Sequence, residues 1–537
     1  TRGLAPIRTH NPTLTTDGPR IYYTTVKDGD WAVFQIPAGG GQPEQIPLPF
    51  KGPMFVLGYS RAESVLLIAT DPNLAGWSLW TTPITGGSPR RLGDLRHPAD
   101  LSPDGRRIAT IDWSTSNLAV ADLDGTASRT IARVPSESRG LGWSPDGTRL
   151  RFNGRGPKGH ESEFWKWEAA VDGGAVEPLW EGAGGSWTPD GRFFVFVRRT
   201  SARSPADLYV ARESRRWGRR RGPVTRLTFG PHSFRAPVLS LDGSRIFAFG
   251  EEPRAELMRW EVTPGRFVPF LGGASAGMVD ASSDGRWLAW VSFPDGILWR
   301  SRRDGSERLQ LTSGSAYAYL PRWSPDGTRI AYAAEGEGGW RHSIRVISMT
   351  GGAEATVASP TAPDHCYWDP CWLPDGRTIL FSNLDDVQPP GIHRVDVDTL
   401  QRDLLPGSEY LKYPKCGRQG QVLAQQVGRF GEPAPADGYG FKVLWPDRST
   451  WESVGDLALN YPSWSRDGRF LYGLNLQARR VQRLALDGRQ LEDVAVVGFP
   501  LANWVFNPWF GIDVDDTPML MADRGTYEIY ALEWEAP

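Results

Sequence analysis

A phrase of the form Trp-Ser-Pro-Asp-Gly, followed by alternating apolar residues, recurs along the whole chain and constrains its fold more than any other feature. Recognisable copies begin at Leu101, Trp143, Trp187, Leu239, Ser282, Trp323, Trp372 and Trp464. The turn aspartates stand at positions 17, 104, 146, 190, 242, 284, 326, 375, 467 and 515, and degenerate copies around Arg61 and Gln419 fill two wider gaps. Twelve units in 537 residues average about 45 residues each, a period typical of propeller repeats.

Each unit predicts four short antiparallel strands. Asp-Gly supplies the positive backbone dihedrals that a tight hairpin needs, and a preceding proline such as Pro325 favours entry into the turn. A further strand, for example Ile344 to Ile347, and a second glycine-rich turn at Gly351-Gly352 follow the first hairpin. Four antiparallel strands per unit make the blade of a β-propeller.

We therefore predict an all-β fold of two tandem β-propellers built from twelve four-stranded blades, because one ring of twelve exceeds the usual ~4–8 blades. Six plus six is favoured, with seven plus five as the alternative. The simplest division places the first propeller at residues 1–272 and the second at 273–537. The last unit offers only three strands, so we expect residues 4–9 to pair with the final blade and remove an open edge. One ring would then contain both termini and the other would be inserted in it.

The composition fits a rigid all-β chain and points to no charged polymer as a partner. The 61 glycines and 44 prolines favour turns, and many of the 24 tryptophans stand where neighbouring blades should pack. A net charge of −2 gives no reason to expect nucleic acid or an anionic membrane surface. No run of ~18 apolar residues is present. The chain begins with Thr1, so we expect it to be a fragment or a processed product, with any membrane contact made through a missing N-terminal segment.

The three cysteines are an odd number and cannot form a complete disulfide framework. Cys371 and Cys416 occupy similar places in adjacent units, so a bridge between them is one alternative. Cys366 and Cys371 lie five residues apart, which does not suit a zinc site. We favour buried free thiols.

No catalytic set is recognisable. Residues 273–277 match the Gly-x-Ser-x-Gly hydrolase pattern, but they fall in a loop between blades without the helix that this motif requires. The seven histidines have no metal-binding spacing, and the basic run at residues 212–226 is interpreted as a solvated outer loop. We expect no cofactor and no metal. A non-enzymatic role is favoured over the alternative, a propeller lyase or hydrolase with its active site at a channel mouth.

Aromatic residues distinguish the later repeats from the earlier ones. The loops that lead into units eight to twelve are rich in them, whereas loops of the earlier repeats carry His97, Arg139 and Arg235 instead. Aromatic side chains around a concavity suit a protein, peptide or glycan ligand, and packing between blades is the alternative. The predicted ligand-binding residues at this mouth are Tyr317, Tyr319, His365, Tyr367, Trp368, Tyr410, Tyr413, Tyr461 and Trp504.

The phrase LPRWSPDGTRIAY at Leu320 resembles the TolB-type propeller repeat, and no Gly-His…Trp-Asp pairing of the tryptophan–aspartate repeat is found. The segments LTTDGPRIYYTT at Leu14, ITGGSPRRLGDL at Ile84, FPDGILWRSRRDGSERLQLT at Phe293 and RGTYEIYALEWEAP at Arg524 resemble the C-terminal propeller region of acidobacterial membrane-bound regulators of the CadC type.

That resemblance implies a sensory or protein-interaction module of a transcriptional regulator, placed on the periplasmic side of the inner membrane. In the family, a winged-helix DNA-binding domain and one transmembrane helix precede the propeller. Neither segment is found in this sequence, so the resemblance assigns neither DNA binding nor membrane anchoring to this chain.

Overall fold

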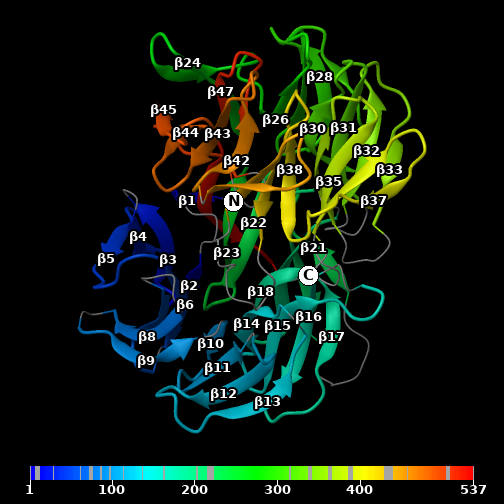
Figure 1. Cartoon of the computed structure of the whole chain (residues 1–537). Coiled ribbons are helices and arrows are strands. Elements are labelled where there is room, and N and C mark those ends of the chain that lie inside the picture. Colours follow the sequence, from blue (N-terminus) through cyan, green and yellow to red (C-terminus); the bar gives the residue numbers. More distant parts are fainter. Residues whose placement is uncertain are drawn as a thin grey trace. The chain divides into compact units, whose positions relative to one another are not determined.

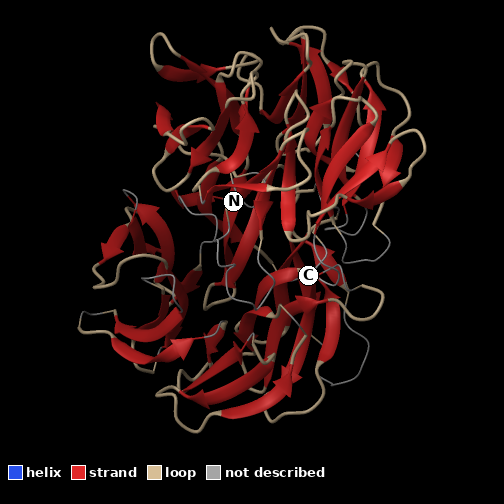
Figure 2. Ribbon diagram, viewed as in Figure 1, coloured by secondary structure: helices blue, strands red, loops and turns tan. Residues whose placement is uncertain are grey.

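In a computed structural model of the chain, every described residue lies in a strand, a turn or a loop (Figure 1, Figure 2). The described residues are 2–6, 13–27, 30–60, 62–71, 77–84, 87–95, 98–112, 114–135, 137–160, 164–200, 204–213, 223–313, 316–336, 342–360, 366–384, 391–427, 440–455, 457–503 and 508–535. They form twelve four-stranded antiparallel sheets, which confirms the predicted all-β fold of twelve blades. No helix long and apolar enough to cross a membrane occurs within these ranges.

The sheets belong to two compact units. Unit 1 comprises Thr1–Glu252 together with Thr526–Pro537, and unit 2 comprises Pro253–Gly525. The simple division at 272/273 therefore does not match the structure, because the chain leaves unit 1 after β23 (Arg245–Glu252) and returns to it only for β48 (Thr526–Glu533). Each unit contains six sheets, so six plus six is confirmed.

The six blades of unit 1 each run from an innermost strand outward. They are β2 (Leu14–Thr16), β3 (Arg20–Lys27), β4 (Asp30–Pro37), β5 (Glu44–Ile46); β6 (Met54–Ser60), β7 (Val65–Thr70), β8 (Trp77–Pro83), β9 (Arg90–Leu95); β10 (Ala99–Leu101), β11 (Arg107–Asp112), β12 (Asn117–Asp122), β13 (Arg129–Arg133); β14 (Arg139–Trp143), β15 (Arg149–Arg155), β16 (Phe164–Ala170), β17 (Glu177–Glu181); β18 (Ala183–Trp187), β19 (Phe193–Arg198), β20 (Asp207–Arg212), β21 (Val224–Arg226); and β22 (Ser233–Leu239), β23 (Arg245–Glu252), β48 (Thr526–Glu533), β1 (Arg2–Pro6).

The six blades of unit 2 follow in the same order. They are β26 (Ala276–Ala281), β27 (Trp287–Ser292), β28 (Leu298–Arg302), β29 (Leu309–Gln310); β30 (Tyr317–Trp323), β31 (Arg329–Glu335), β32 (His342–Ser348), β33 (Ala355–Ala358); β34 (Tyr367–Trp372), β35 (Thr378–Asn383), β36 (Gly391–Asp396), β37 (Arg402–Leu404); β38 (Leu411–Cys416), β39 (Val422–Gln426), β40 (Phe441–Leu444), β41 (Glu452–Gly455); β42 (Asn460–Trp464), β43 (Phe470–Asn475), β44 (Arg480–Ala485), β45 (Leu491–Val496); and β46 (Phe510–Ile512), β47 (Pro518–Asp523), β24 (Ala255–Glu261), β25 (Arg266–Pro269).

The innermost strands close a ring in each unit. In unit 1 each one contacts the next from β2 to β22, and β22 contacts β2; in unit 2 the series runs from β26 to β46, and β46 contacts β26. Closure of unit 1 joins the two chain ends, because β1 pairs with β48 from Arg2↔Ala531 to Pro6↔Glu528. The expected pairing of the N-terminal piece with the final blade is therefore confirmed, with the strand at Arg2–Pro6 and residues 7–12 outside the described part.

The hairpin after each innermost strand explains the repeated phrase. In β22–β23 the Ser240 hydroxyl donates to Asp242 Oδ1 at 2.5 Å and accepts the Arg245 backbone N–H at 2.9 Å. Asp242 Oδ1 also accepts the Ser244 N–H at 3.0 Å, and Gly243 has a φ of 72°. The hydrogen bonds from Ser240 and Ser244 lower the pKa of Asp242 to about 2. A hydroxyl, a carboxylate and a glycine at fixed spacing therefore specify this turn.

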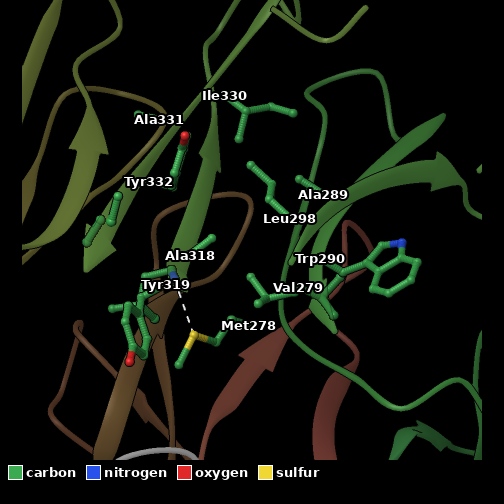
Figure 3. Packing of buried hydrophobic residues seen from close by; sticks show 14 of the residues in the cluster. Met278, Val279, Ala289, Trp290, Leu298, Ala318, Tyr319, Ile330, Ala331 and Tyr332 are labelled. Carbon is green, nitrogen blue, oxygen red and sulfur yellow. Dashed lines mark hydrogen bonds between the residues drawn. The ribbon is translucent and has the colours of Figure 1, made fainter. Parts of the chain in front are cut away.

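The tryptophan that ends an innermost strand connects adjacent blades. The indole N–H of Trp323 donates to the carbonyl of Asp280 in the preceding blade at 3.2 Å. Trp143, Trp372 and Trp464 donate in the same way to Asp100, Arg322 and Lys415, at 3.2, 3.1 and 2.8 Å. The predicted packing of these tryptophans between blades is confirmed. Between the first two blades of unit 2, a hydrophobic cluster includes the fully buried side chains of Met278, Leu298 and Ile330 (Figure 3).

Cys371 and Cys416 form a disulfide with a sulfur–sulfur distance of 2.04 Å, and Cys366 is free. The favoured expectation of three free thiols is therefore wrong for two of them. The bridge joins β34 to β38, whose inner positions face each other once the two blades are adjacent in the ring.

Candidate functional site

The innermost strands of unit 2 carry bulges that hold large side chains in a left-handed backbone conformation. Each of five innermost strands shifts register with the second strand of its blade just before its own last residues. These strands are β26, β30, β34, β38 and β42. At these shifts φ is positive, between 49° and 59°, for Met278, Leu320, Asp369, Tyr413 and Tyr461.

Three innermost strands of unit 1 have the same bulge, with smaller residues in it. The corresponding residues of β14, β18 and β22 are Gly140, Gly184 and Ala236, with φ of 63°, 56° and 46°. A left-handed backbone costs roughly 1–2 kcal/mol for a residue with a side chain and almost nothing for glycine. Five inner positions of unit 2 therefore carry this strain, whereas in unit 1 only Ala236 carries it and Gly140 and Gly184 avoid it.

The bulge side chains reach the innermost strand of the next blade. The sulfur of Met278 accepts the backbone N–H of Leu320 at 3.2 Å, drawn as the dashed line in Figure 3. The carboxylate of Asp369 pairs with the ammonium group of Lys415 in the next blade. This layer of unit 2 is filled, because the side chains of Met278, Leu320 and Asp369 are buried.

Asp369 and Lys415 form a buried ion pair, with side chains only 3% and 7% exposed. Burial lowers the pKa of Lys415 to about 8 although the Asp369 carboxylate opposes the shift. Among the described residues, Asp369 Oδ1 has no hydrogen-bond partner, and the Arg322 guanidinium lies 3.8 Å from it. A buried carboxylate oxygen that accepts no hydrogen bond lowers the stability of the folded state, so this oxygen needs an explanation.

Two phenols adjoin this ion pair. Burial raises the pKa of Tyr413, and the negative charge of Asp369 raises it further. The pKa of Tyr461 is raised by the same two causes, and by the neighbouring phenol of Tyr413. Both phenols are therefore neutral hydrogen-bond donors at physiological pH and are not bases.

Three of the predicted binding residues are buried in the blades of unit 2. Tyr319, Tyr367 and Trp368 are 6%, 3% and 9% exposed. Tyr319 donates from its hydroxyl to Glu335 at 2.8 Å and lies against Trp368 with ring centroids 4.8 Å apart. The Tyr367 hydroxyl accepts a hydrogen bond from Arg402 at 2.6 Å. Tyr319 and Trp368 therefore pack against each other between blades, as the alternative interpretation holds, whereas Tyr367 contacts Phe381 and Arg402 of its own blade.

The remaining predicted residues divide into two groups. Tyr317, Tyr410, Tyr413 and Tyr461 are half-buried, and Tyr317 stacks on Tyr319 with centroids 4.7 Å apart. His365 and Trp504 lie outside the described residues. The structure thus brings tyrosines of three blades, those of β30, β38 and β42, to the leading half of the innermost strands of unit 2.

A cysteine–histidine contact lies beside these tyrosines. Cys366 Sγ and His342 Nδ1 are 2.8 Å apart, and His342 packs edge-on against Trp368. Burial raises the pKa of the Cys366 thiol to about 12, so the thiol is protonated and a poor nucleophile at neutral pH. Across the described ranges, no group of three or more His, Cys, Asp or Glu side chains is arranged to hold a metal ion.

The charged members of the site, Arg322, Asp369 and Lys415, were not predicted from the sequence. A usable signal was present for two of them. Arg322 and Lys415 directly precede the residue that ends an innermost strand, Trp323 or Cys416, where an apolar or small residue is expected. A charge at that position indicates a partner in the adjacent blade.

Comparison with known proteins gives local sequence similarity and general structural likeness. No protein-family profile matches the chain. An uncharacterised protein of Agrobacterium fabrum is 26% identical over 110 residues, which is 19% of this chain and 38% of that protein.

Among solved structures, a proposed TolB from Agrobacterium tumefaciens is 19% identical with a TM-score of 0.39, over 50% of this chain and 98% of that one. TolB from Acinetobacter baumannii is 17% identical with a TM-score of 0.28, over 62% and 78% of the two chains. The Niastella koreensis GH74 enzyme is 11% identical with a TM-score of 0.34, over 95% and 90%. The propeller fold of this chain stands on its own twelve sheets.

Proposed function

We propose that this protein is a non-catalytic ligand-binding module whose ligand docks at the leading ends of the innermost strands of unit 2. One observation carries the proposal: unit 2 accepts strained backbone at Asp369, Tyr413 and Tyr461, where unit 1 uses small residues. Strain of this kind persists only where the surrounding structure enforces it, and it is concentrated at functional sites.

The chemistry of the cluster favours binding over catalysis. The Tyr413 and Tyr461 phenols are protonated, and the Cys366 thiol is protonated as well. Lys415 is held by Asp369 and is 7% exposed, so it is not placed to attack a substrate. What the half-buried tyrosines offer a ligand is an apolar face and a hydroxyl each, which suits a peptide or a glycan.

A rigid ring that binds a ligand at one end suits the sensory part of a larger regulator. Binding would shift an attached regulator between states only through a difference in affinity for those states. The resemblance of the segments at Leu14, Ile84, Phe293 and Arg524 to CadC-type regulators supports this role and a periplasmic location. Fractionation of cells that express the complete gene product tests the location.

Ligand screening by thermal unfolding, with peptides and oligosaccharides as separate arms, tests the binding function. A ligand at 100 times its dissociation constant stabilises the folded state by ~2.7 kcal/mol. Tyr413→Phe and Tyr461→Phe each remove one hydroxyl and are expected to weaken binding about two- to tenfold. Tyr59→Phe on β6 of unit 1 is the matched control and should leave the affinity unchanged. Turnover of any compound, or binding that ignores all three substitutions, would overturn the proposal.

A further inference from the structure

In two adjacent blades of unit 2, an arginine precedes the turn aspartate or the glutamine that replaces it. Five other turns have proline there, at Pro103, Pro145 and Pro189 in unit 1 and at Pro325 and Pro374 in unit 2, and four have Thr16, Leu241, Ser283 or Val514. The turns after β38 and β42 carry Arg418 and Arg466 instead, and both side chains are exposed. The turn itself does not require arginine, since proline, threonine, leucine, serine and valine occupy the same place elsewhere.

The two guanidinium groups end at one place. Arg418 Nη1 donates to the carbonyl of Ser283 at 3.4 Å, and Arg466 Nη1 donates to the carbonyl of Val514 at 3.4 Å. Ser283 and Val514 lie on neighbouring turns that touch, because a Cβ added to Gly285 would lie 3.3 Å from the Val514 side chain.

Arg418 reaches this junction from the far side of the ring. Its strand, β38, is three blades from β26 in a ring of six, so the side chain extends past the axis to Ser283. Arg466 comes from the blade between β38 and β46. The two turns that carry the arginines also touch, since the Gln419 amide donates to the Asp467 carbonyl at 3.3 Å.

Within the described part of the chain, most of the hydrogen-bonding capacity of the two arginines is unused. Each guanidinium has five N–H donors, and each makes one long bond to a carbonyl. Neither forms an ion pair with a carboxylate of the described residues. Other arginines of the same turns do, for example Arg286 with Asp284 at 2.6 Å and Arg469 with Asp467 at 2.8 Å.

Most carboxylates near this junction are paired with other arginines: Asp284 with Arg286, Asp467 with Arg469, and Asp513 and Asp515 with Arg259 and Arg303. Asp280 lies close enough to Arg418 for the two charges to interact, but it accepts the backbone N–H of Trp323 at 2.7 Å, and burial raises its pKa. Asp516 accepts the backbone N–H of Arg466 at 2.7 Å, and burial raises its pKa also. The Asp369 charge deeper in the ring is matched by Lys415. Asp280 and Asp516 interact electrostatically with Arg418 and Arg466 but form no ion pair with them, so both guanidinium groups can still bind an anion from outside.

We propose that Arg418 and Arg466 form a binding site for a small oxyanion, a phosphate or carboxylate group, at the turn end of the unit 2 ring. Planar forks from two directions match the oxygens of such a group and hold it by charge-assisted hydrogen bonds. The site lies at the opposite ends of the innermost strands from the tyrosines and is independent of the ligand bound there.

Titration of the full chain with inorganic phosphate, and separately with succinate, tests this site. Binding is followed by calorimetry and thermal unfolding at low, constant ionic strength set with sodium chloride, because screening weakens exposed charges. The wild type should bind at least one of the two anions, and the arm that responds identifies the phosphate or carboxylate source. Arg418→Gln and Arg466→Gln should each weaken binding about tenfold or more.

Arg469→Gln is the matched control, since it removes an exposed arginine of the same turn that is already paired. It should bind as the wild type does. Unfolding in chloride alone shows whether each variant folds. Absence of any response to either anion at constant ionic strength, or equal loss in all three variants, overturns the site and leaves the tyrosine site untouched.

Discussion

Asp100 and Trp143 make two hydrogen bonds across a blade boundary of unit 1. The Asp100 carboxylate accepts the Trp143 backbone N–H at 3.1 Å, and the Asp100 carbonyl accepts the indole N–H at 3.2 Å. Asp280 and Trp323 repeat both bonds in unit 2, at 2.7 and 3.2 Å. An aspartate at the equivalent position thus connects two blades in each ring. Burial raises the pKa of both Asp100 and Asp280.

The Asp100 joint predicts a pH-dependent stability. Burial raises the pKa of Asp100 from 3.8 to about 7, so the folded state binds this proton more tightly than the unfolded state. The stabilising contribution of the protonated group is complete below pH ~4 and is lost as the pH rises through about 7. Asp100→Asn keeps the acceptor and removes the titration, so it should be more stable than the wild type at pH 8, by at most ~4 kcal/mol.

Urea unfolding of both proteins between pH 5 and pH 8 measures this difference. The gap between the two free energies of unfolding should widen with rising pH. Asp124→Asn is the control, because Asp124 lies in an exposed turn of the same blade and its pKa is lowered by Thr126. Parallel curves for wild type and Asp100→Asn would contradict the prediction.

Removing one partner of the buried ion pair of unit 2 should lower the unfolding free energy strongly. Replacing both partners with apolar residues should lower it much less. Lys415→Met leaves the Asp369 charge buried without its main partner and should cost ~3–5 kcal/mol of unfolding free energy. The double variant with Asp369→Leu removes both charges and should recover most of that loss. Arg394→Gln breaks an exposed pair with Asp403 and should cost less than ~1 kcal/mol. If the double variant is no more stable than Lys415→Met, the unpaired Asp369 charge does not cause the loss of stability.

The repeats allowed the blades, their number and the packing of the tryptophans to be predicted, because each depends on local spacing. The division of the rings did not follow from them. Strands β23 and β24 are separated by only Pro253 and Arg254, yet they belong to different units, because each pairs with a strand more than 250 residues further along the chain. Sequence pattern specifies a strand, whereas its neighbour is chosen by long-range pairing.

The candidate site was predictable only in its aromatic part. The tyrosines stood out as a cluster, but a left-handed bulge at Asp369 leaves no trace in a sequence, unlike one at Gly140. The register shift turns Asp369 toward Lys415, a residue that lies 46 positions away. Side-chain direction at a bulge depends on the strand pairing, so it emerges only with the fold.

The disulfide between Cys371 and Cys416 should stabilise unit 2 by limiting the unfolded chain. The two cysteines are 45 positions apart, and closing a loop of this length is worth ~4 kcal/mol in the chain-entropy estimate. The double variant Cys371→Ser with Cys416→Ser should lose about that much unfolding free energy, measured in urea. Cys366→Ser should change the unfolding free energy little by comparison. Thiol titration of the unfolded protein should find one free thiol before reduction and three after it. Three thiols without reductant would contradict the bridge.

Closure of unit 1 by its first strand predicts a selective effect of truncation. Removing residues 1–6 exposes the edge of β48, which otherwise pairs with β1 from Arg2 to Pro6. Loss of a few backbone hydrogen bonds, at ~1 kcal/mol each, should lower the stability of unit 1 by ~2–4 kcal/mol and promote association through the open edge. Unit 2 contains no strand from either terminus, so its unfolding transition should stay in place. A synthetic peptide of residues 1–12 added in trans should reverse this association and restore the lost stability, since it supplies the missing edge strand. Equal destabilisation of both units, or no rescue by the peptide, would show that the ring of unit 1 is held closed without β1.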